Sequence, residues 1–123
     1  MASLIDSNII IYSYLNEYQY LREMIIDGTS NISEISRIEI LGYHGLKNDE
    51  ESYFNDIFTL VNIIIPTQEI FDRAISIRKQ YNLKLGDSLI AATAIVSNLT
   101  LYTKNIRDFE KITGLKSINP VSK

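Results

Sequence analysis

Residues 1–15, MASLIDSNIIIYSYL, place one acidic residue inside an otherwise apolar segment. Residues 2–6 predict a short buried strand, and the Ser-Asn pair that follows Asp6 is typical of the start of a helix, here one over residues 9–15. The carboxylate of Asp6 can cap that helix. It can also belong to a functional site, because ligands of parallel sheets bind beyond the carboxyl ends of the strands.

The rest of the chain alternates between helical and strand patterns, without a linker, a repeat or a low-complexity tract. Helical patterns cover residues 18–26, 34–46, 49–61, 68–81 and 88–98, and a short helix is expected in the loop 104–112. Strand patterns cover residues 31–33, 62–65, 100–103 and 115–119. The run 62–65 is β-branched and stops at Pro66, which predicts a buried strand. Strands separated by helices predict one α/β domain with a parallel sheet covered on both faces.

Composition excludes several kinds of chemistry. The chain has no Cys and a single His, His44, so thiolate sites and disulfides are excluded, and a histidine-rich metal site or a Ser-His-Asp triad would depend on one residue. The helical pattern places His44 on a solvent face. The apolar runs are far shorter than a membrane span and no targeting segment precedes them, so we expect a cytoplasmic protein without membrane contact.

Charge is distributed unevenly along the chain, although the net charge is only −3. Residues 1–72 carry 12 acidic and 3 basic residues, a net charge of −9, whereas residues 73–123 carry 3 acidic and 9 basic residues, a net charge of +6. This asymmetry either reflects solvated helix faces or indicates that the C-terminal half faces a polyanion.

A second notable acid lies in SEISRIEILGYHGL, residues 33–46. At 100° per residue, Glu39 falls in the middle of one helical stripe that is predicted to face the core. The other members of that stripe are Ile35, Ile38, Gly42 and Leu46. A carboxylate on a buried face is costly unless it is paired, protonated or bound to a metal. A salt bridge to a distant base and a ligand role both remain open for Glu39.

Two further acids complete the set. Asp87, in KLGDSLIAATAIVSN, marks the N-terminus of a strongly apolar helix, where it can act as a cap, as a cation ligand or as both. Asp108, in TKNIRDFEKI, lies just past the strand 100–103 and either balances Arg107 and Lys111 at the surface or joins the same edge of the sheet.

Four acids at one edge force protonation or the binding of a cation. A ligand set of oxygen atoms alone favours a hard ion, so we expect Mg²⁺ or Mn²⁺. Such an ion lowers the pKa of a bound water and stabilises charge on a phosphate oxygen, which explains how the site could act without a histidine base.

Four segments together resemble the PIN-domain nucleases and, within them, the VapC-like toxins of toxin-antitoxin pairs. The segments are LIDSNIIIY, ISEISRIEILGY, LKLGDSLIAATAI and TLYTKNIRDFEKITGLKSINP, in the order of the family's own blocks. The resemblance covers essentially the whole chain. It implies a single PIN-like domain over residues 1–123, with a three-layer α/β fold in which helices flank a twisted, mainly parallel sheet.

The resemblance also implies an activity, partners and residue roles. The activity is divalent-metal-dependent cleavage of RNA, and the partners are a second copy of the chain and a cognate antitoxin. The metal-binding, catalytic acids would be Asp6, Glu39, Asp87 and Asp108. The polar residues near the metal or the phosphate would be Asn8, Thr103 and Asn105.

We therefore expect an RNA-cleaving toxin that uses Mg²⁺ or Mn²⁺. Bases that flank Asp87 and Asp108 are candidates for phosphate contacts, although each can serve solubility alone; they are Lys84, Lys104, Arg107 and Lys111. Apolar residues of the early helices can form a dimer or antitoxin surface, or simply core; they are Tyr14, Tyr18, Leu21 and Met24. The alternative function is that of a non-catalytic binding module with an acidic pocket, such as a degenerate PIN scaffold.

Overall fold

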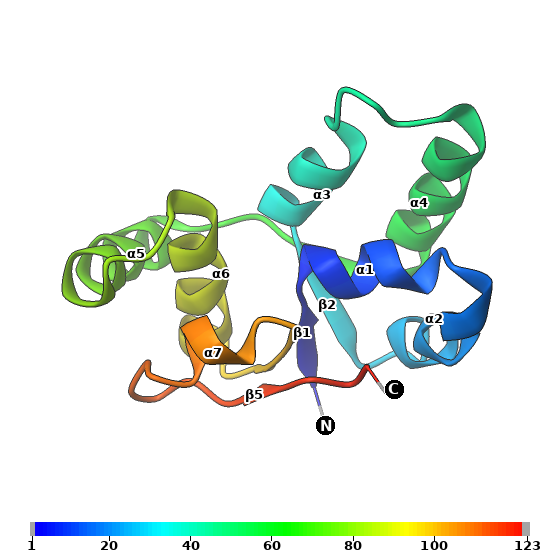
Figure 1. Ribbon diagram of the computed structural model, residues 1–123. Helices are drawn as coiled ribbons and strands as arrows, with labels where there is room; N and C mark the ends of the chain where they lie inside the picture. The colour runs from blue at the N-terminus through cyan, green and yellow to red at the C-terminus, as the bar shows by residue number, and fades with distance from the viewer. Residues whose placement is uncertain (1, 122–123) are drawn as a thin grey trace.

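The computed structural model describes residues 2–121 and contains one five-stranded sheet within them (Figure 1). The strands are β1 (Ser3–Ile5), β2 (Ser30–Ser33), β3 (Asn62–Ile64), β4 (Thr100–Tyr102) and β5 (Ser117–Ile118). Their order in the sheet is β3-β2-β1-β4-β5, and all four neighbouring pairs are parallel. The carboxyl ends of the strands therefore meet at one edge, as the alternating sequence pattern predicts.

Helices connect the strands. They are α1 (Ser7–Ser13), α2 (Gln19–Ile25), α3 (Glu34–Leu41), α4 (Asn48–Leu60), α5 (Gln68–Tyr81), α6 (Leu85–Val96) and α7 (Ile106–Phe109). A 3-10 turn, Asn16–Tyr18, precedes α2. No helix within residues 2–121 has the length and apolarity that crossing a bilayer requires.

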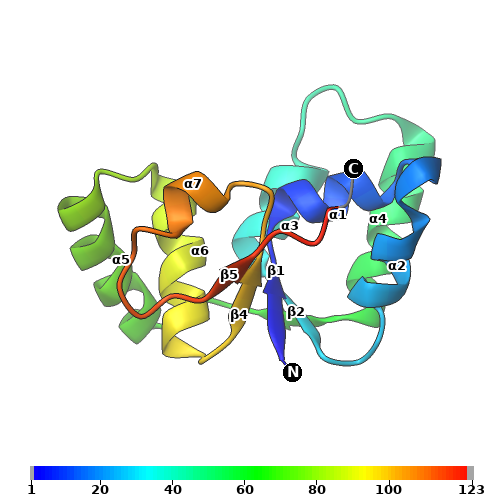
Figure 2. The same cartoon turned by 60° about the horizontal axis from the view of Figure 1, so that its bottom comes forward.

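Two apolar clusters cover the two faces of the sheet and give the three layers. Adjacent residues of β1 point to opposite faces, so Leu4 packs with residues of α5, α6 and α7, whereas Ile5 packs with residues of α1, α2 and α4. Figures 1 and 2 show these two groups of helices on either side of the strands. The three-layer α/β prediction is confirmed.

Strand β3 differs from the prediction of a buried strand. It is the terminal strand of the described sheet, its Asn62 is exposed, and the following Ile65 is 72% exposed. The β-branched run predicts the strand correctly. It does not show whether a further strand pairs with the free side of β3 and buries it.

Helix α3 is shorter than predicted and presents another face to the core. It ends at Leu41, and the backbone N–H of Gly42 donates to the carbonyl of Ile38 at 2.8 Å. The buried positions are Ser36 and Ile40, whereas Ile38 is 60% exposed. The predicted core stripe is therefore wrong.

Candidate functional site

Asp6 lies at the carboxyl end of β1 and caps α1. Its Oδ1 accepts the backbone N–H of Ser7 at 2.8 Å, so the capping role is real. Its Oδ2 accepts the hydroxyl of Thr103 at 2.8 Å, and the Nδ2 of Asn8 lies 3.5 Å away. The side chain is only 7% exposed, which means that a buried carboxylate is held in one orientation by donors from two elements.

Thr103 connects the polar residues that the sequence assigned to the site. It is fully buried directly after β4, and its Oγ1 accepts the backbone N–H of Asn105 at 3.0 Å and the Nδ2 of Asn8 at 3.3 Å. Because the same hydroxyl donates to Asp6, it links the ends of β1 and β4. The structure thus brings together Asn8, Thr103 and Asn105 around Asp6.

Replacing Thr103 with Val keeps the shape of the side chain but removes this hydroxyl. We expect the free energy of unfolding to fall by about 1 to 3 kcal/mol, because Asp6 and the N–H of Asn105 lose a buried partner. Urea denaturation measures the loss. Thr103→Ser retains the hydroxyl and is the matched control, so equal stability of the two variants would contradict a structural role for this hydrogen bond.

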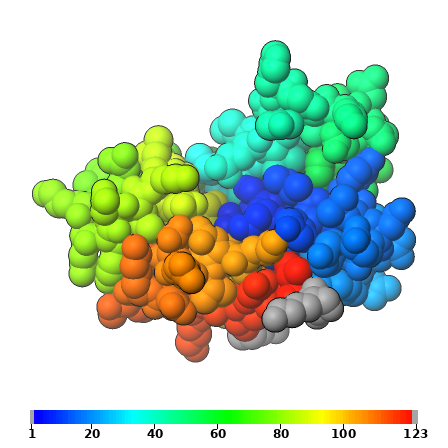
Figure 3. Space-filling view, viewed as in Figure 1, coloured from blue at the N-terminus to red at the C-terminus, as the bar shows by residue number. Residues whose placement is uncertain are grey.

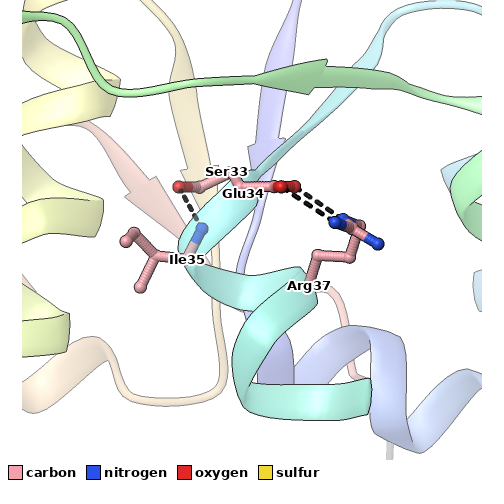
Figure 4. A network of polar contacts seen from close by, with 4 residues as sticks. All are labelled: Ser33, Glu34, Ile35 and Arg37. Carbon is pink, nitrogen blue, oxygen red and sulfur yellow. Dashed lines mark hydrogen bonds and ion pairs between the residues drawn. The ribbon is translucent and has the colours of Figure 1, made fainter. Parts of the chain in front are cut away.

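Glu39 reaches the same edge from α3. It is exposed, and its Oε1 accepts the hydroxyl of Ser7 at 2.7 Å, which ties α3 to the start of α1. The first turn of α3 is fixed as well: Ser33 accepts the backbone N–H of Ile35, and Glu34 pairs with Arg37 at 2.6 Å (Figure 4). Glu39 therefore faces the site from a helix that is anchored at its beginning, and not from a buried stripe.

Asp87 lies in the first turn of α6, close to Glu39. The helix begins at Leu85 with Lys84 as its cap residue, so the prediction that Asp87 is the N-cap is wrong. A Cβ placed on Gly86 would lie 3.1 Å from Oε2 of Glu39. The absence of a side chain at Gly86 therefore lets α6 and Glu39 approach each other.

Asp108 lies in α7, which begins three residues after Thr103. Its Oδ2 accepts the Nδ2 of Asn105 at 2.8 Å, and its side chain is half-buried. Asp108 is therefore oriented by a neighbouring amide, and within residues 2–121 it forms no ion pair with Arg107 or Lys111.

The electrostatics of the site link the four acids through their charges. The pKa of Asp6 is raised to about 6, chiefly by burial and also by the charges of Asp87 and Glu39, while the hydrogen bonds from Thr103 and Ser7 act in the opposite direction. Burial also raises the pKa of Asp87, as do the charges of Asp108 and Glu39, whereas Lys84 opposes the shift. The ionised site carries mutual repulsion that a bound cation would relieve.

The donor set fits a hard divalent cation in its chemistry, because all four candidate ligands are carboxylates. Within residues 2–121, however, no three such side chains are already arranged as a finished metal site. Raised pKa values of this kind are expected where carboxylates meet without a counter-ion. The chemistry of the donors therefore suits Mg²⁺ or Mn²⁺, whereas their arrangement within residues 2–121 is not that of a formed metal site.

The four predicted phosphate-binding bases differ in their surroundings. Lys84 caps α6, and Arg107 and Lys111 are exposed in or after α7. Lys104 is half-buried, and its backbone N–H donates to Oδ1 of Asn8 at 3.2 Å. Lys104 is therefore the base most directly connected to the polar residues of the site.

Sequence reasoning missed three residues of this site. Ser7 was taken as a helix-starting residue only, yet its hydroxyl holds Glu39. Gly86 has no side chain that would crowd the carboxylate of Glu39, and the Lys104 ammonium packs over the ring of Tyr12. No local pattern identifies these contacts, although an LGD tripeptide at the start of a buried helix is a signal for close approach at Gly86.

Figure 3 shows how the site is set into the surface. The outline has a notch between the yellow-green surface of α5 and α6 and the cyan surface of α3, and the blue N-terminal segment lies beside it. The hollow therefore lies between α3, which carries Glu39, and the surface of α5 and α6, the latter carrying Asp87.

Comparison with known proteins agrees with this geometry. The PIN domain family matches residues 3–115. Ribonuclease VapC1 of Rickettsia felis is 29% identical over 134 aligned residues, covering 100% of this chain and 99% of the relative. Ribonuclease VapC10 of Mycobacterium tuberculosis is 30% identical, covering 92% of this chain and 90% of the relative.

Solved structures give the same result. A toxin-antitoxin complex from Klebsiella pneumoniae matches with a TM-score of 0.82 and 29% identity, over 99% of this chain and 100% of the matched one. VapBC2 of Rickettsia felis, bound to a DNA fragment from its promoter, shares the fold with a TM-score of 0.82 and 24% identity, over 97% of this chain and 98% of the matched one. The chain belongs to the PIN domain family, and within it is VapC-like.

Proposed function

We propose that this protein is a divalent-metal-dependent endoribonuclease that acts as the toxin of a toxin-antitoxin pair. The observation that carries the proposal is the meeting of four acids from four segments at the carboxyl edge of the sheet: Asp6, Glu39, Asp87 and Asp108. Ionised carboxylates grouped in this way lower the stability of the fold unless a cation binds between them. The relatives named as VapC ribonucleases support RNA as the substrate.

The residues around the acids orient the carboxylate oxygens. Ser7 directs Glu39 through its hydroxyl, Thr103 directs Asp6, and Asn105 directs Asp108. In Glu39 and Asp108 these hydrogen bonds occupy one oxygen and leave the other for a ligand, as partners behind a metal ligand commonly do. Both oxygens of Asp6 accept hydrogen bonds, which hold that carboxylate in one orientation. Asp87 is positioned by the first turn of α6 instead.

Mg²⁺ or Mn²⁺ held by Asp6, Glu39, Asp87 and Asp108 would lower the pKa of a water and stabilise charge on a phosphate oxygen. The chain's own bases would hold the RNA. Lys84, Arg107 and Lys111 surround the acidic edge with exposed positive charge, and they remain candidates for phosphate contacts.

The antitoxin is the second part of the proposal, and the solved toxin-antitoxin complex supports it. The early helices offer less free surface than the sequence suggested. Leu21 is fully buried, and Tyr18 and Met24 pack against the core, whereas Tyr14 lines an apolar cavity of about 340 Å³ that is also lined by Glu39. An apolar segment seated there would lie against the active-site edge. The homodimer stays a prediction.

Cleavage of a mixed cellular RNA pool tests the enzymatic part. We expect purified protein to produce discrete fragments with Mn²⁺ or Mg²⁺, to produce none with excess chelator, and to recover when the ion is returned. Gel electrophoresis of the RNA measures the outcome, and circular dichroism confirms that the chelated protein stays folded. A folded protein, free of antitoxin, that cleaves with neither ion would favour the non-catalytic binding module.

A further inference from the structure

Lys104 is held at both ends by helix α1. Its backbone N–H donates to Oδ1 of Asn8, and its ammonium lies 3.8 Å from the centroid of the Tyr12 ring and donates to the Tyr12 hydroxyl. Asn8 and Tyr12 are one turn apart on the same face of α1. Figure 2 shows the connection from β4 to α7 passing the start of α1, where these contacts form.

The Tyr12 ring is itself supported from behind. The ring of Tyr18 lies 5.1 Å from it between centroids, with an interplanar angle of 55°. Both tyrosines are half-buried and pack against the same apolar cluster as Ile9 and Ile10. The Tyr12 ring, on which the ammonium packs, is therefore held in place by the fold.

The Lys104 ammonium contacts Tyr12 and forms no ion pair with a carboxylate of the described residues. Within residues 2–121 the structure contains one ion pair, between Arg37 and Glu34. An ammonium has three donors, and the Tyr12 hydroxyl takes one, so two remain for an incoming anion. Tyr12 thus holds the charge of this lysine on α1 and leaves two of its donors for another partner.

The other three bases lack such support. Within the described part of the chain, the side chains of Lys84, Arg107 and Lys111 form no hydrogen bond or ion pair, and all three are exposed. A free lysine must lose rotamer freedom when it binds a phosphate, whereas a lysine already held in place loses little. Lys104 therefore differs from the other three bases in that its side chain is already ordered before a phosphate binds.

We propose that Tyr12 is a positioning residue that holds the Lys104 ammonium at the edge of the carboxylate site, where it binds a backbone phosphate of the RNA. The inference rests on the proposed ribonuclease function. Lys104 contacts the substrate, and Tyr12 acts through Lys104. The backbone of Lys104 lies at this edge because Lys104 directly follows Thr103, the partner of Asp6, and its N–H donates to Asn8.

Steady-state cleavage of a fluorescein-labelled single-stranded RNA of mixed sequence, at several salt concentrations, tests the pair. We expect Lys104→Gln to raise KM about 10-fold, the equivalent of one charged hydrogen bond. We also expect it to reduce the salt slope of kcat/KM by about 0.7, the contribution of one phosphate contact on a single strand. The control Lys116→Gln removes the same charge from an exposed residue just before β5, at the opposite edge of the sheet, and should change neither.

Tyr12 is tested with a second pair of variants. Tyr12→Leu removes the ring and the hydroxyl, and should raise KM about threefold with an unchanged salt slope, because a mobile lysine still carries its charge. Tyr12→Phe keeps the ring but loses the hydroxyl that accepts from the ammonium, so its KM should lie between those of wild type and Tyr12→Leu. In a Lys104→Gln background, Tyr12→Leu should have no further effect on KM, because contacts that act as a unit are not additive.

The outcomes separate this inference from the proposed function. If wild-type protein cleaves the RNA but Lys104→Gln keeps the wild-type KM and salt slope, the phosphate contact is wrong and the nuclease stands. If Tyr12→Leu adds its full effect to Lys104→Gln, the role of Tyr12 is structural only. If wild-type protein does not cleave at all, the proposed function fails, and this inference fails with it.

Discussion

Replacing Asp87 with Asn is expected to reduce metal-dependent RNA cleavage by about 100- to 1000-fold, as the loss of one group that stabilises transition-state charge commonly does. The charges of Asp108 and Glu39 both act on Asp87, so we expect its carboxylate to be important for binding the proposed cation. Initial rates on a labelled RNA, with Mn²⁺ in excess, measure the loss.

The same substitution should not weaken the fold. The pKa of Asp87 is raised by burial and by its acidic neighbours, which means that the folded protein disfavours the ionised form. A neutral amide of the same shape removes that penalty, so the melting temperature in chelator should be equal to or above that of wild type. Asp56→Asn, at an exposed position of α4, is the control and should keep full activity. An active Asp87→Asn enzyme would contradict the proposed metal site.

Three of the four candidate acids could be placed from the sequence because each follows a strand or lies at the start of a helix. In a parallel sheet, position along the chain then determines position in space: the end of β1 gives Asp6, and the segment after β4 gives Asp108. The start of α6 gives Asp87, although the helix begins at Leu85 and not at the acid itself. Local patterns thus predict the edge of the sheet well and the terminal residues of elements less well.

Helix α3 shows where local patterns fail. Its isoleucines are spread around the helix, so several stripes compete for the core, and the structure buries Ile40 while Ile38 stays exposed. The helical pattern predicted that Glu39 belongs to the site because it would be buried in the core. Glu39 is in fact exposed, so that reason was wrong. Its proximity to Asp87 depends on the small Gly86 in another segment, which no helical periodicity contains.

Contacts between distant segments could not be predicted from one sequence. Ser7 and Glu39 are 32 residues apart, and Tyr12 and Lys104 are 92 residues apart. Each contact depends on how a helix lies on the sheet, which follows from the packing of two apolar clusters and not from the residues that touch. The candidate acids and the orienting residues Thr103 and Asn105 are therefore visible in the sequence, whereas the contacts of Ser7 and Gly86 with Glu39 are not.

Asp6 should make the metal-free protein less stable as pH rises. Its pKa is about 6 in the folded chain against an ordinary 3.8, so the protonated form is favoured by folding. The stability that it contributes is complete below pH 3.8 and is lost as pH rises through about 6, with a total change of about 3 kcal/mol. Urea denaturation in chelator between about pH 4 and about pH 8, a range that covers most of this transition, measures the change.

Two variants isolate the contribution of Asp6. Asp6→Asn cannot ionise, so the difference between its stability and that of wild type should vary with pH across the window that ends near 6. Asp27 gives the opposite sign, because hydrogen bonds from Thr29 lower its pKa, and Asp27→Asn should remove stability that is present at neutral pH and lost in acid. The difference in the free energy of unfolding between wild type and Asp6→Asn could instead be constant from about pH 4 to about pH 8. Ionised Asp6 would then carry no penalty in the metal-free protein, and a bound cation would have no such penalty to remove.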